Sequence, residues 1–145
     1  MTNSKAELLQ NWYDRAWRDG DLSAIDETFL PGTSASGVVP SLQLSRADFE
    51  AFLDALRNLM RNIKVTIVQS MEQGDWLAAR LLLSGESAGT GVPVSATGQV
   101  MLQFRGGKIA ATYGQLDYFT LFEQLGQLPA DALPICLTGQ RLDWA

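Results

Sequence analysis

The aspartate Asp117 is the most prominent candidate for chemistry in this sequence. It lies in the stretch QLDYFTLFEQLG, between an apolar strand-like run and an apolar helix-like run. An isolated carboxylate among apolar neighbours is costly to desolvate unless a partner or a reaction makes use of it. Two roles suit it, and the sequence alone leaves both open: an N-cap for the helix that starts at Tyr118, or a group that transfers protons.

Two polar side chains accompany Asp117 on the preceding strand. With a period of two, Ile109, Ala111, Tyr113, Gln115 and Asp117 share one face of that strand. We therefore expect Tyr113, Gln115 and Asp117 to form a polar file on an otherwise apolar strand. If this face is the concave face of a sheet, the file points into a cavity.

The residue types that are missing restrict the chemistry. The chain has no histidine and a single cysteine, Cys136. This excludes triads that use imidazole as a base and nearly excludes the common zinc sites. Any acid–base chemistry must therefore be performed by carboxylates, tyrosine, lysine or bound water. We expect neither a metal nor an organic cofactor.

A literal nucleophile-elbow motif, GESAG, surrounds Ser87. The motif needs a strand–turn–helix context and a histidine partner. Here more strand-like sequence follows and the chain has no histidine. Catalysis by Ser87 as a nucleophile is therefore disfavoured, and the stretch is interpreted as a turn between strands.

Length and charge define the class of protein. The 145 residues are consistent with one domain over residues 1–145 that buries a substantial core, and 46% of them are hydrophobic. The 16 acidic and 11 basic residues give a net charge of −5, which argues against nucleic acid or an anionic membrane surface as the main partner. No apolar run approaches the length of a membrane span, and the N-terminus lacks a secretory apolar core. We expect a cytoplasmic protein.

Helical periodicity dominates the first part of the chain. Ser4 and Glu7 have the spacing of a capping box at the start of a first helix. Tyr13 and Trp17 lie one turn apart on that helix and would line a cavity together. The pattern predicts a second helix over 21–30 and a third that carries Phe52 and ends near residue 60.

The period then changes from helical to strand-like. Residues 63–67 alternate between apolar and polar side chains, as in a half-buried strand. Further strands are expected over 76–85 and on both sides of Arg105-Gly106-Gly107, which favours a two-residue hairpin turn. A short helix is predicted over 118–125. Helices followed by successive antiparallel strands indicate an α+β domain whose bent sheet encloses a cavity.

Several stretches together carry a resemblance to a known family. They are WRDGDL from Trp17, GDWLAARLLLSGESAG at 74–89, GKI at 107–109, Asp117, and QLG at 124–126. In this order and spacing the chain resembles a SnoaL-like polyketide cyclase, within the nuclear transport factor 2-like superfamily. The resemblance covers about residues 10–126 and leaves a C-terminal tail, residues 127–145, uncovered.

The resemblance implies a cone of three helices wrapped by a strongly curved antiparallel sheet, with the ligand inside. It also implies that Asp117 acts as the acid–base group in an intramolecular aldol closure. The family usually has histidine at the position of Ser87, and glutamate and tryptophan at the positions of Ala111 and Tyr113. This chain thus keeps the scaffold and the acid but replaces the polar companions of the acid.

Two functions of different classes remain open. The first is a cofactor-independent enzyme of the cyclase, isomerase or hydratase (lyase) type, with Asp117 as its general acid–base. The alternative is a non-catalytic protein that binds a small apolar ligand in the same cone. Trp12 and Trp76 are assigned to packing. The residues expected to line the ligand site in either case are Tyr13, Trp17, Phe52, Ser87, Tyr113 and Gln115.

We also expect a homodimer. The outer face of the sheet would form the interface, with Leu83, Leu102 and Phe104 as its apolar candidates. The tail would add contact through Trp144.

Overall fold

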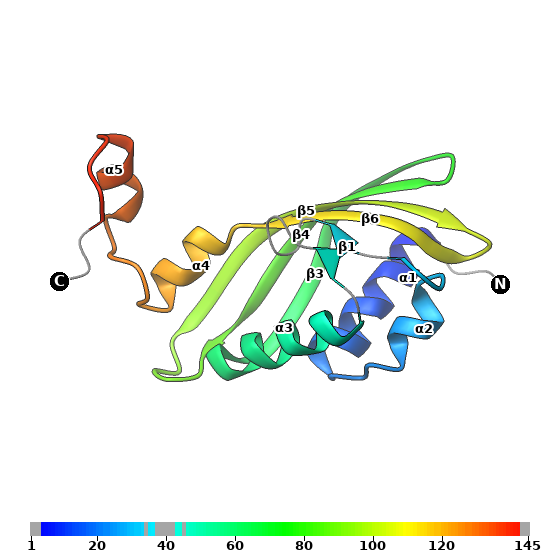
Figure 1. Ribbon diagram of the computed structural model, residues 1–145, viewed down its shortest axis with the longest axis horizontal. Helices are drawn as coiled ribbons and strands as arrows, with labels where there is room; N and C mark the ends of the chain where they lie inside the picture. Colours follow the sequence, from blue (N-terminus) through cyan, green and yellow to red (C-terminus); the bar gives the residue numbers. More distant parts are fainter. Residues whose placement is uncertain (1–3, 34, 37–42, 45, 143–145) are drawn as a thin grey trace.

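The computed structural model describes residues 4–33, 35–36, 43–44 and 46–142. Trp144, named above as a possible dimer contact, lies outside these residues. The described chain folds into a long curved sheet with helices on its concave side (Figure 1). The expected α+β architecture is confirmed.

The first helix is assembled from two kinds of turn. It begins as α1, Lys5–Trp12, where the Ser4 side chain accepts a hydrogen bond from the Glu7 amide at 3.1 Å, as the capping box predicts. It continues as the π-helix η1, Tyr13–Arg18. The wider π turn is closed by the Asp19 amide, which donates to the Asp14 carbonyl at 3.1 Å. Two further helices precede the long strands of the sheet: α2, Ala24–Thr28, and α3, Arg46–Leu59.

Four long antiparallel strands form the body of the sheet. Two short strands extend it beyond β6, and the first of these pairs with β6 in parallel. The complete order is β2-β1-β6-β5-β4-β3. The strand bounds are β1, Ala35–Ser36; β2, Gln43–Leu44; β3, Met60–Gln73; β4, Trp76–Ser87; β5, Pro93–Arg105; and β6, Lys108–Leu116.

The turn between β5 and β6 is the two-residue hairpin that the sequence predicts. Arg105 pairs with Lys108, and Gly106 and Gly107 both have positive φ, 60° and 80°. A left-handed pair of this kind matches the twist of the flanking strands. Glycine adopts this conformation at both positions without steric cost.

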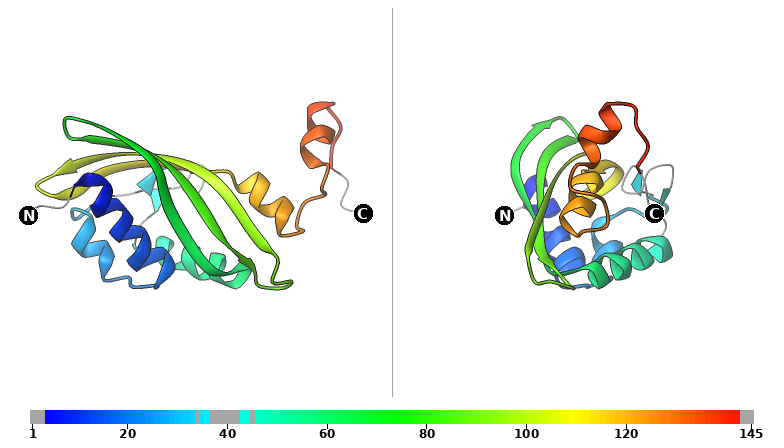
Figure 2. Two further views of the ribbon diagram at one scale, coloured as in Figure 1. Left: turned by 180° about the vertical axis from the view of Figure 1, so that it is seen from behind. Right: turned by 90° about the vertical axis from the view of Figure 1, so that its left-hand side faces the viewer.

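The sheet curls around the helices, so that α1, η1, α2 and α3 all lie on its concave side (Figure 2). The Gln10 side chain joins the first helix to the edge strand β3. Its Nε2 atom donates to the Val65 carbonyl at 2.8 Å, and its Oε1 atom accepts from the Ile67 amide at 3.0 Å. An amide side chain thus pairs with an edge strand as a neighbouring strand would, and it holds α1 against the sheet.

One extra residue in β6 changes which side chains face inward. Gln103 pairs with Ala111, but the next pair is Phe104 with Ile109, so Ala110 has no partner of its own. Such a bulge inverts the alternation of side chains along the strand. Our expectation that Tyr113 shares the face of Ile109 is therefore wrong: Ile109 is fully buried, whereas Tyr113 is 54% exposed.

The apolar residues expected on the outer face lie on the inner face instead. Leu83, Leu102 and Phe104 are 0%, 1% and 6% exposed and belong to the core. The correction has a physical reason. Long apolar runs such as the one around Leu83 do not alternate, so the sequence cannot tell the two faces of the strand apart.

The chain leaves the sheet through α4, Tyr118–Gln124, and Gly126, with a φ of 80°, follows it. The tail then forms α5, Ala132–Leu137, a helix that the sequence pattern did not reveal. It lies beyond α4, away from the sheet (Figure 1). Among the described residues, no helix is both long and apolar enough to cross a membrane.

Candidate ligand cavity

A cavity of about 710 Å³ lies between the helices and the concave face of the sheet. Its size is that of a site for a small organic molecule. The helices and the segment after α2 supply an aromatic wall, and the sheet supplies a mostly aliphatic floor. The wall includes Trp12, Tyr13, Trp17, Phe29 and Phe49, and the floor includes Val65, Leu81, Val100, Leu102, Thr112 and Gly114.

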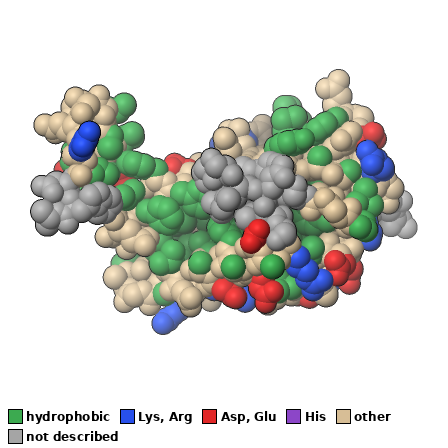
Figure 3. All heavy atoms as spheres, viewed as in Figure 1, with side chains coloured by type: hydrophobic (Ala, Val, Ile, Leu, Met, Phe, Trp, Pro, Cys, Tyr) green, Lys and Arg blue, Asp and Glu red, His purple; other side chains and the backbone are tan. Residues whose placement is uncertain are grey.

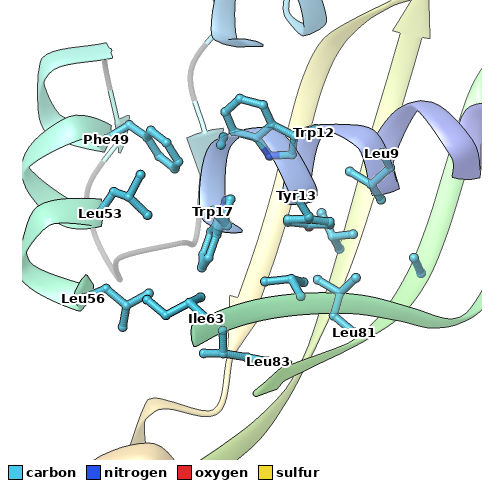
Figure 4. Packing of buried hydrophobic residues seen from close by; sticks show 14 of the residues in the cluster. Leu9, Trp12, Tyr13, Trp17, Phe49, Leu53, Leu56, Ile63, Leu81 and Leu83 are labelled. Carbon is cyan, nitrogen blue, oxygen red and sulfur yellow. The ribbon is translucent and has the colours of Figure 1, made fainter. Parts of the chain in front are cut away.

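The aromatic wall is a connected set of ring contacts. The rings of Tyr13 and Trp17 meet edge to face with centroids 5.9 Å apart, and Trp17 also contacts Phe49 at 6.1 Å. Trp12 meets Phe29 edge to face at 4.8 Å. Figure 4 shows Trp17 between Phe49 on α3 and Tyr13 on its own helix. Rings that brace one another in this way keep the wall in place without a ligand.

Two polar hydrogen-bond donors lie within this aromatic wall. The indole Nε1 of Trp17 is buried, and no described group accepts a hydrogen bond from it. The Tyr13 side chain is 6% exposed, and burial raises the pKa of its hydroxyl far above the ordinary value. The hydroxyl therefore stays protonated and acts as a donor rather than as a base. Both donors belong to residues that line the cavity.

Charged groups lie at the border of the cavity rather than within it. Arg46 donates to Asp26 at 2.9 Å, and both residues line the cavity. Both side chains are more than half exposed. On the face shown in Figure 3, charged side chains gather along α3 and α2, and hydrophobic ones reach the surface between α3 and α4. The buried wall itself has no charge.

Of the six expected binding residues, Tyr13 and Trp17 line the cavity, and the exposed Gln115 borders both this cavity and a hollow on the outer face of the sheet. Phe52 lies behind the wall, with its ring 5.6 Å from that of Trp17, and it does not line the cavity. It also contacts Tyr118 at 6.5 Å, and burial raises the pKa of Tyr118 to about 12.

Ser87 and Tyr113 lie elsewhere. Ser87 ends β4 and is buried, with its hydroxyl accepting from the Thr90 amide at 3.4 Å within the turn to β5. Tyr113 lies on the outer face of the sheet, where its ring stacks on Trp76 with an interplanar angle of 24°. Neither residue lines the interior cavity. A role for either one in binding stays a prediction without support from the geometry.

Asp117 is the N-cap of α4. One carboxylate oxygen, Oδ1, accepts from the Thr120 amide at 3.0 Å, and the other, Oδ2, accepts from the Thr120 hydroxyl at 2.6 Å. Its own amide donates to the Thr97 carbonyl at 2.9 Å. The side chain is exposed and does not line the cavity. The cap is thus observed, whereas acid–base catalysis by Asp117 stays a prediction.

Sequence reasoning missed several residues that form the cavity. Trp12 was assigned to packing alone, although it adjoins Tyr13 on the same helix face. Phe49 belongs to the apolar stripe of α3, and its spacing alone does not distinguish a cavity wall from a core position. Thr112 became a floor residue only through the bulge at Ala110. Of these residues, only Trp12 could have been predicted from the sequence, through its position next to Tyr13 on the first helix.

A second hollow, of about 680 Å³, lies on the outer face of the sheet. Two rows of paired residues cross four strands there, one apolar and one polar. Arg80 in the polar row donates to Gln69 at 3.2 Å. The apolar row is Met71, Ala78, Met101 and Tyr113, and the polar row is Gln69, Arg80, Gln99 and Gln115.

The fold and the cavity define an α+β cone protein with an interior cavity. In the described part of the chain, no three acidic or cysteine side chains cluster closely enough to hold a metal. The family model for SnoaL-like polyketide cyclases matches residues 7–125. The chain belongs to the SnoaL-like polyketide cyclase family. No curated protein matches its sequence.

Solved structures share the fold at low sequence identity. IdmH from Streptomyces antibioticus, described as a putative polyketide cyclase, is 21% identical, with a TM-score of 0.70 over 85% of this chain and 99% of its own. AclR from Streptomyces galilaeus, described as a putative hydroxylase, is 22% identical, with a TM-score of 0.70 over 86% and 98%. A Catenulispora acidiphila protein with a ketosteroid isomerase-like fold, in complex with trimethylamine, is 20% identical, with a TM-score of 0.71 over 90% and 98%.

Proposed function

We propose that this chain binds a small, largely apolar molecule in the interior cavity and holds an acceptor atom of that molecule through Trp17 and Tyr13. The observation that carries the proposal is the buried Trp17 N–H, which has no hydrogen-bond partner among the described residues and belongs to a side chain beside a cavity of about 710 Å³. A buried donor without a partner costs about 1–3 kcal/mol. A carbonyl or similar acceptor on a ligand would recover this cost.

The character of the wall supports an uncharged ligand. The groups that surround the donors are aromatic and aliphatic, and the nearest charged pair, Asp26 and Arg46, lies at the exposed border. An ionised group inside would therefore lose its hydration without gaining a partner. Membership in a polyketide cyclase family supports a polyketide-like molecule, which combines apolar carbon with carbonyl oxygens.

Catalysis is the second candidate function. It is favoured by the family and by the resemblance that makes Asp117 the acid–base group of an aldol-type ring closure or a related isomerisation. Tyr13 would then donate to the developing oxyanion. Against this role, both carboxylate oxygens of Asp117 are engaged by Thr120, and the side chain faces solvent. Geometry thus supports binding better than proton transfer by Asp117.

One experiment tests the binding proposal. Protein purified under native conditions is analysed by mass spectrometry for a co-purified small molecule, and the affinity of that molecule is compared between the wild type and Trp17→Phe. We expect Trp17→Phe to bind about tenfold more weakly, because it removes the N–H but keeps an aromatic ring. Equal affinity of the two proteins would contradict the role of the indole donor.

Asp117→Asn separates binding from catalysis. The asparagine oxygen still caps α4 but cannot act as a base. If the chain only binds, the variant keeps the ligand affinity of the wild type and changes no reaction. If Asp117 transfers protons, conversion of the identified ligand falls by about two to four orders of magnitude while the fold survives.

We also propose a homodimer formed through the outer face of the sheet. Support comes from the exposed apolar side chains Met71, Met101 and Tyr113, which lie in one row across that face. Light scattering of the wild type should give twice the mass of one chain, and Met101→Lys should give the mass of one chain. A monomeric wild type at micromolar concentration would overturn this proposal.

A further inference from the structure

We propose that Gly114 sets the upper size of the molecule that the cavity accepts. This inference rests on the proposed binding function and goes beyond it, since it assigns ligand selection to a position that has no side chain. Glycine inside a strand weakens the strand, and it often marks a place where a ligand approaches the backbone closely. Gly114 lies inside β6, two residues before its end, and lines the cavity.

Neither the backbone nor the packing requires a glycine at this position. The φ of Gly114 is outside the left-handed region, so any L-residue can adopt its conformation. A Cβ atom added to Gly114 would meet only the Val100 Cγ2 atom at 3.6 Å and the Gln99 carbonyl oxygen at 3.8 Å. Both are ordinary contact distances. The space in front of Gly114 is therefore open.

Gly98, on the neighbouring strand, shows the opposite situation. It pairs with Leu116, and a Cβ atom added to it would lie 2.6 Å from the Leu116 Cδ2 atom and 2.7 Å from the Gln115 carbonyl oxygen. The Leu116 side chain thus fills the space above Gly98. The core needs the glycine at 98, whereas the space above Gly114 remains part of the cavity.

The direction of a side chain at position 114 follows from its neighbours. Gly114 pairs with the buried Val100, and it alternates with Thr112 and Leu116, which line the cavity. A larger residue would therefore project from the floor into the cavity. It would take up part of the volume that a ligand occupies.

A graded series of probes tests the inference. The probes are neutral ketones with two, three and four fused rings: 1-indanone, 9-fluorenone and benzo[b]fluorenone. Binding is measured by the quenching of tryptophan fluorescence in the wild type, Gly114→Ala and Gly114→Leu. Thermal unfolding of each variant reports on the fold, and Gly98→Ala is the matched control.

We expect Gly114→Leu to bind the three-ring and four-ring ketones at least about tenfold more weakly than the wild type, which is about 1.4 kcal/mol. Its affinity for 1-indanone should stay within about twofold. Gly114→Ala should lose affinity for the four-ring ketone alone. Both variants should keep the Tm of the wild type or exceed it, whereas Gly98→Ala should lower the Tm because of its contacts with Leu116 and Gln115.

Each other outcome has a definite meaning. A folded Gly114→Leu that binds all three ketones like the wild type, or that loses all three equally, overturns the role of Gly114 and leaves the binding function standing. If Gly114→Leu does not fold, Gly114→Ala decides by the same size series. A wild type that binds none of the ketones overturns the proposed function itself.

Discussion

The two faces of the sheet differ more than their sequences suggest. Leu102 and Met101 are neighbours on β5, yet Leu102 is 1% exposed and Met101 is 52% exposed. Both faces are hollowed, with volumes of about 710 and 680 Å³. The inner hollow has an aromatic wall with a buried donor, whereas the outer one is crossed by an apolar row and a row of amide and guanidinium groups. Hydrophobicity alone therefore does not identify a ligand site.

The comparison also shows what a single inserted residue can decide. Because Ala110 forms a bulge, Thr112 and Gly114 line the inner cavity, and Tyr113 stacks on Trp76 outside. Without the bulge, the alternation of side chains would place Tyr113 inside and leave Thr112 outside. The chemistry of each face depends on this one position in β6.

The largest expected effect is on the free energy of unfolding, and it is seen by comparing two neighbouring residues on opposite faces of the sheet. Leu102→Ala should lower the free energy of unfolding by about 2–5 kcal/mol, because it leaves a cavity in the core. In the monomer, at protein concentrations too low for the proposed dimer, Met101→Ala should change it by about 0.5 kcal/mol or less, as for most surface substitutions. Urea denaturation followed by circular dichroism measures both. A large loss in Met101→Ala would mean that the outer face is covered in solution, as in the proposed dimer.

The next effect concerns Asp117, where the sheet passes into α4. Asp117→Ala should lower the free energy of unfolding by about 0.5–2 kcal/mol, because it removes the acceptor for the Thr120 amide. Asp117→Asn should lose much less, since its side-chain oxygen still caps the helix. Thermal and urea unfolding of both variants check this prediction. Equal stability of the alanine variant and the wild type would contradict the importance of the cap.

The third prediction compares the loss of a tyrosine hydroxyl on the two faces of the sheet. Tyr13→Phe removes a hydroxyl from the cavity, and Tyr113→Phe removes one from the outer face. We expect Tyr13→Phe to bind 9-fluorenone about five- to tenfold more weakly, the usual value of one hydrogen bond. Tyr113→Phe should bind it like the wild type. If Tyr113→Phe weakened binding and Tyr13→Phe did not, the ligand would belong to the outer hollow.

The smallest expected effect is on the pH dependence of stability. It concerns the ion pairs of Arg15, which lie outside both faces of the sheet. Its guanidinium lowers the pKa of Glu27, and the Ser23 hydroxyl, followed by Arg15, lowers the pKa of Asp21. A carboxylate whose pKa is lower in the folded state than in the unfolded state stabilises the fold when the pH is above its unfolded-state pKa. This stabilisation is lost as the pH falls through its folded-state pKa.

Stability should therefore decline below about pH 4. Arg15→Met should make this decline shallower, as thermal unfolding between pH 2 and 6 would show. Because these side chains are largely exposed, the difference should be small and should shrink further in high salt. An acid-range decline identical to that of the wild type would exclude Arg15 as its source.

Features set by neighbours along the chain were predictable. The N-cap at Ser4, the Gly106-Gly107 turn and the cap at Asp117 each depend on a few consecutive residues, and each is present in the structure. The placement of Tyr13 and Trp17 on one wall followed from helical spacing. The change from a period near 3.6 to a period of 2 was sufficient to predict an α+β fold.

The sequence by itself thus determined the elements, their order and the absence of imidazole chemistry, because these depend on local periodicity and composition. Only the tertiary structure decided which face of the sheet each strand residue occupies and which glycine has open space where a side chain would lie. These outcomes depend on pairing between strands that are distant in sequence: the bulge at Ala110 exists only against Gln103 and Phe104, and Leu116 covers Gly98 but leaves Gly114 uncovered. Side chains that look alike along the chain acquire different roles once the strands are in register.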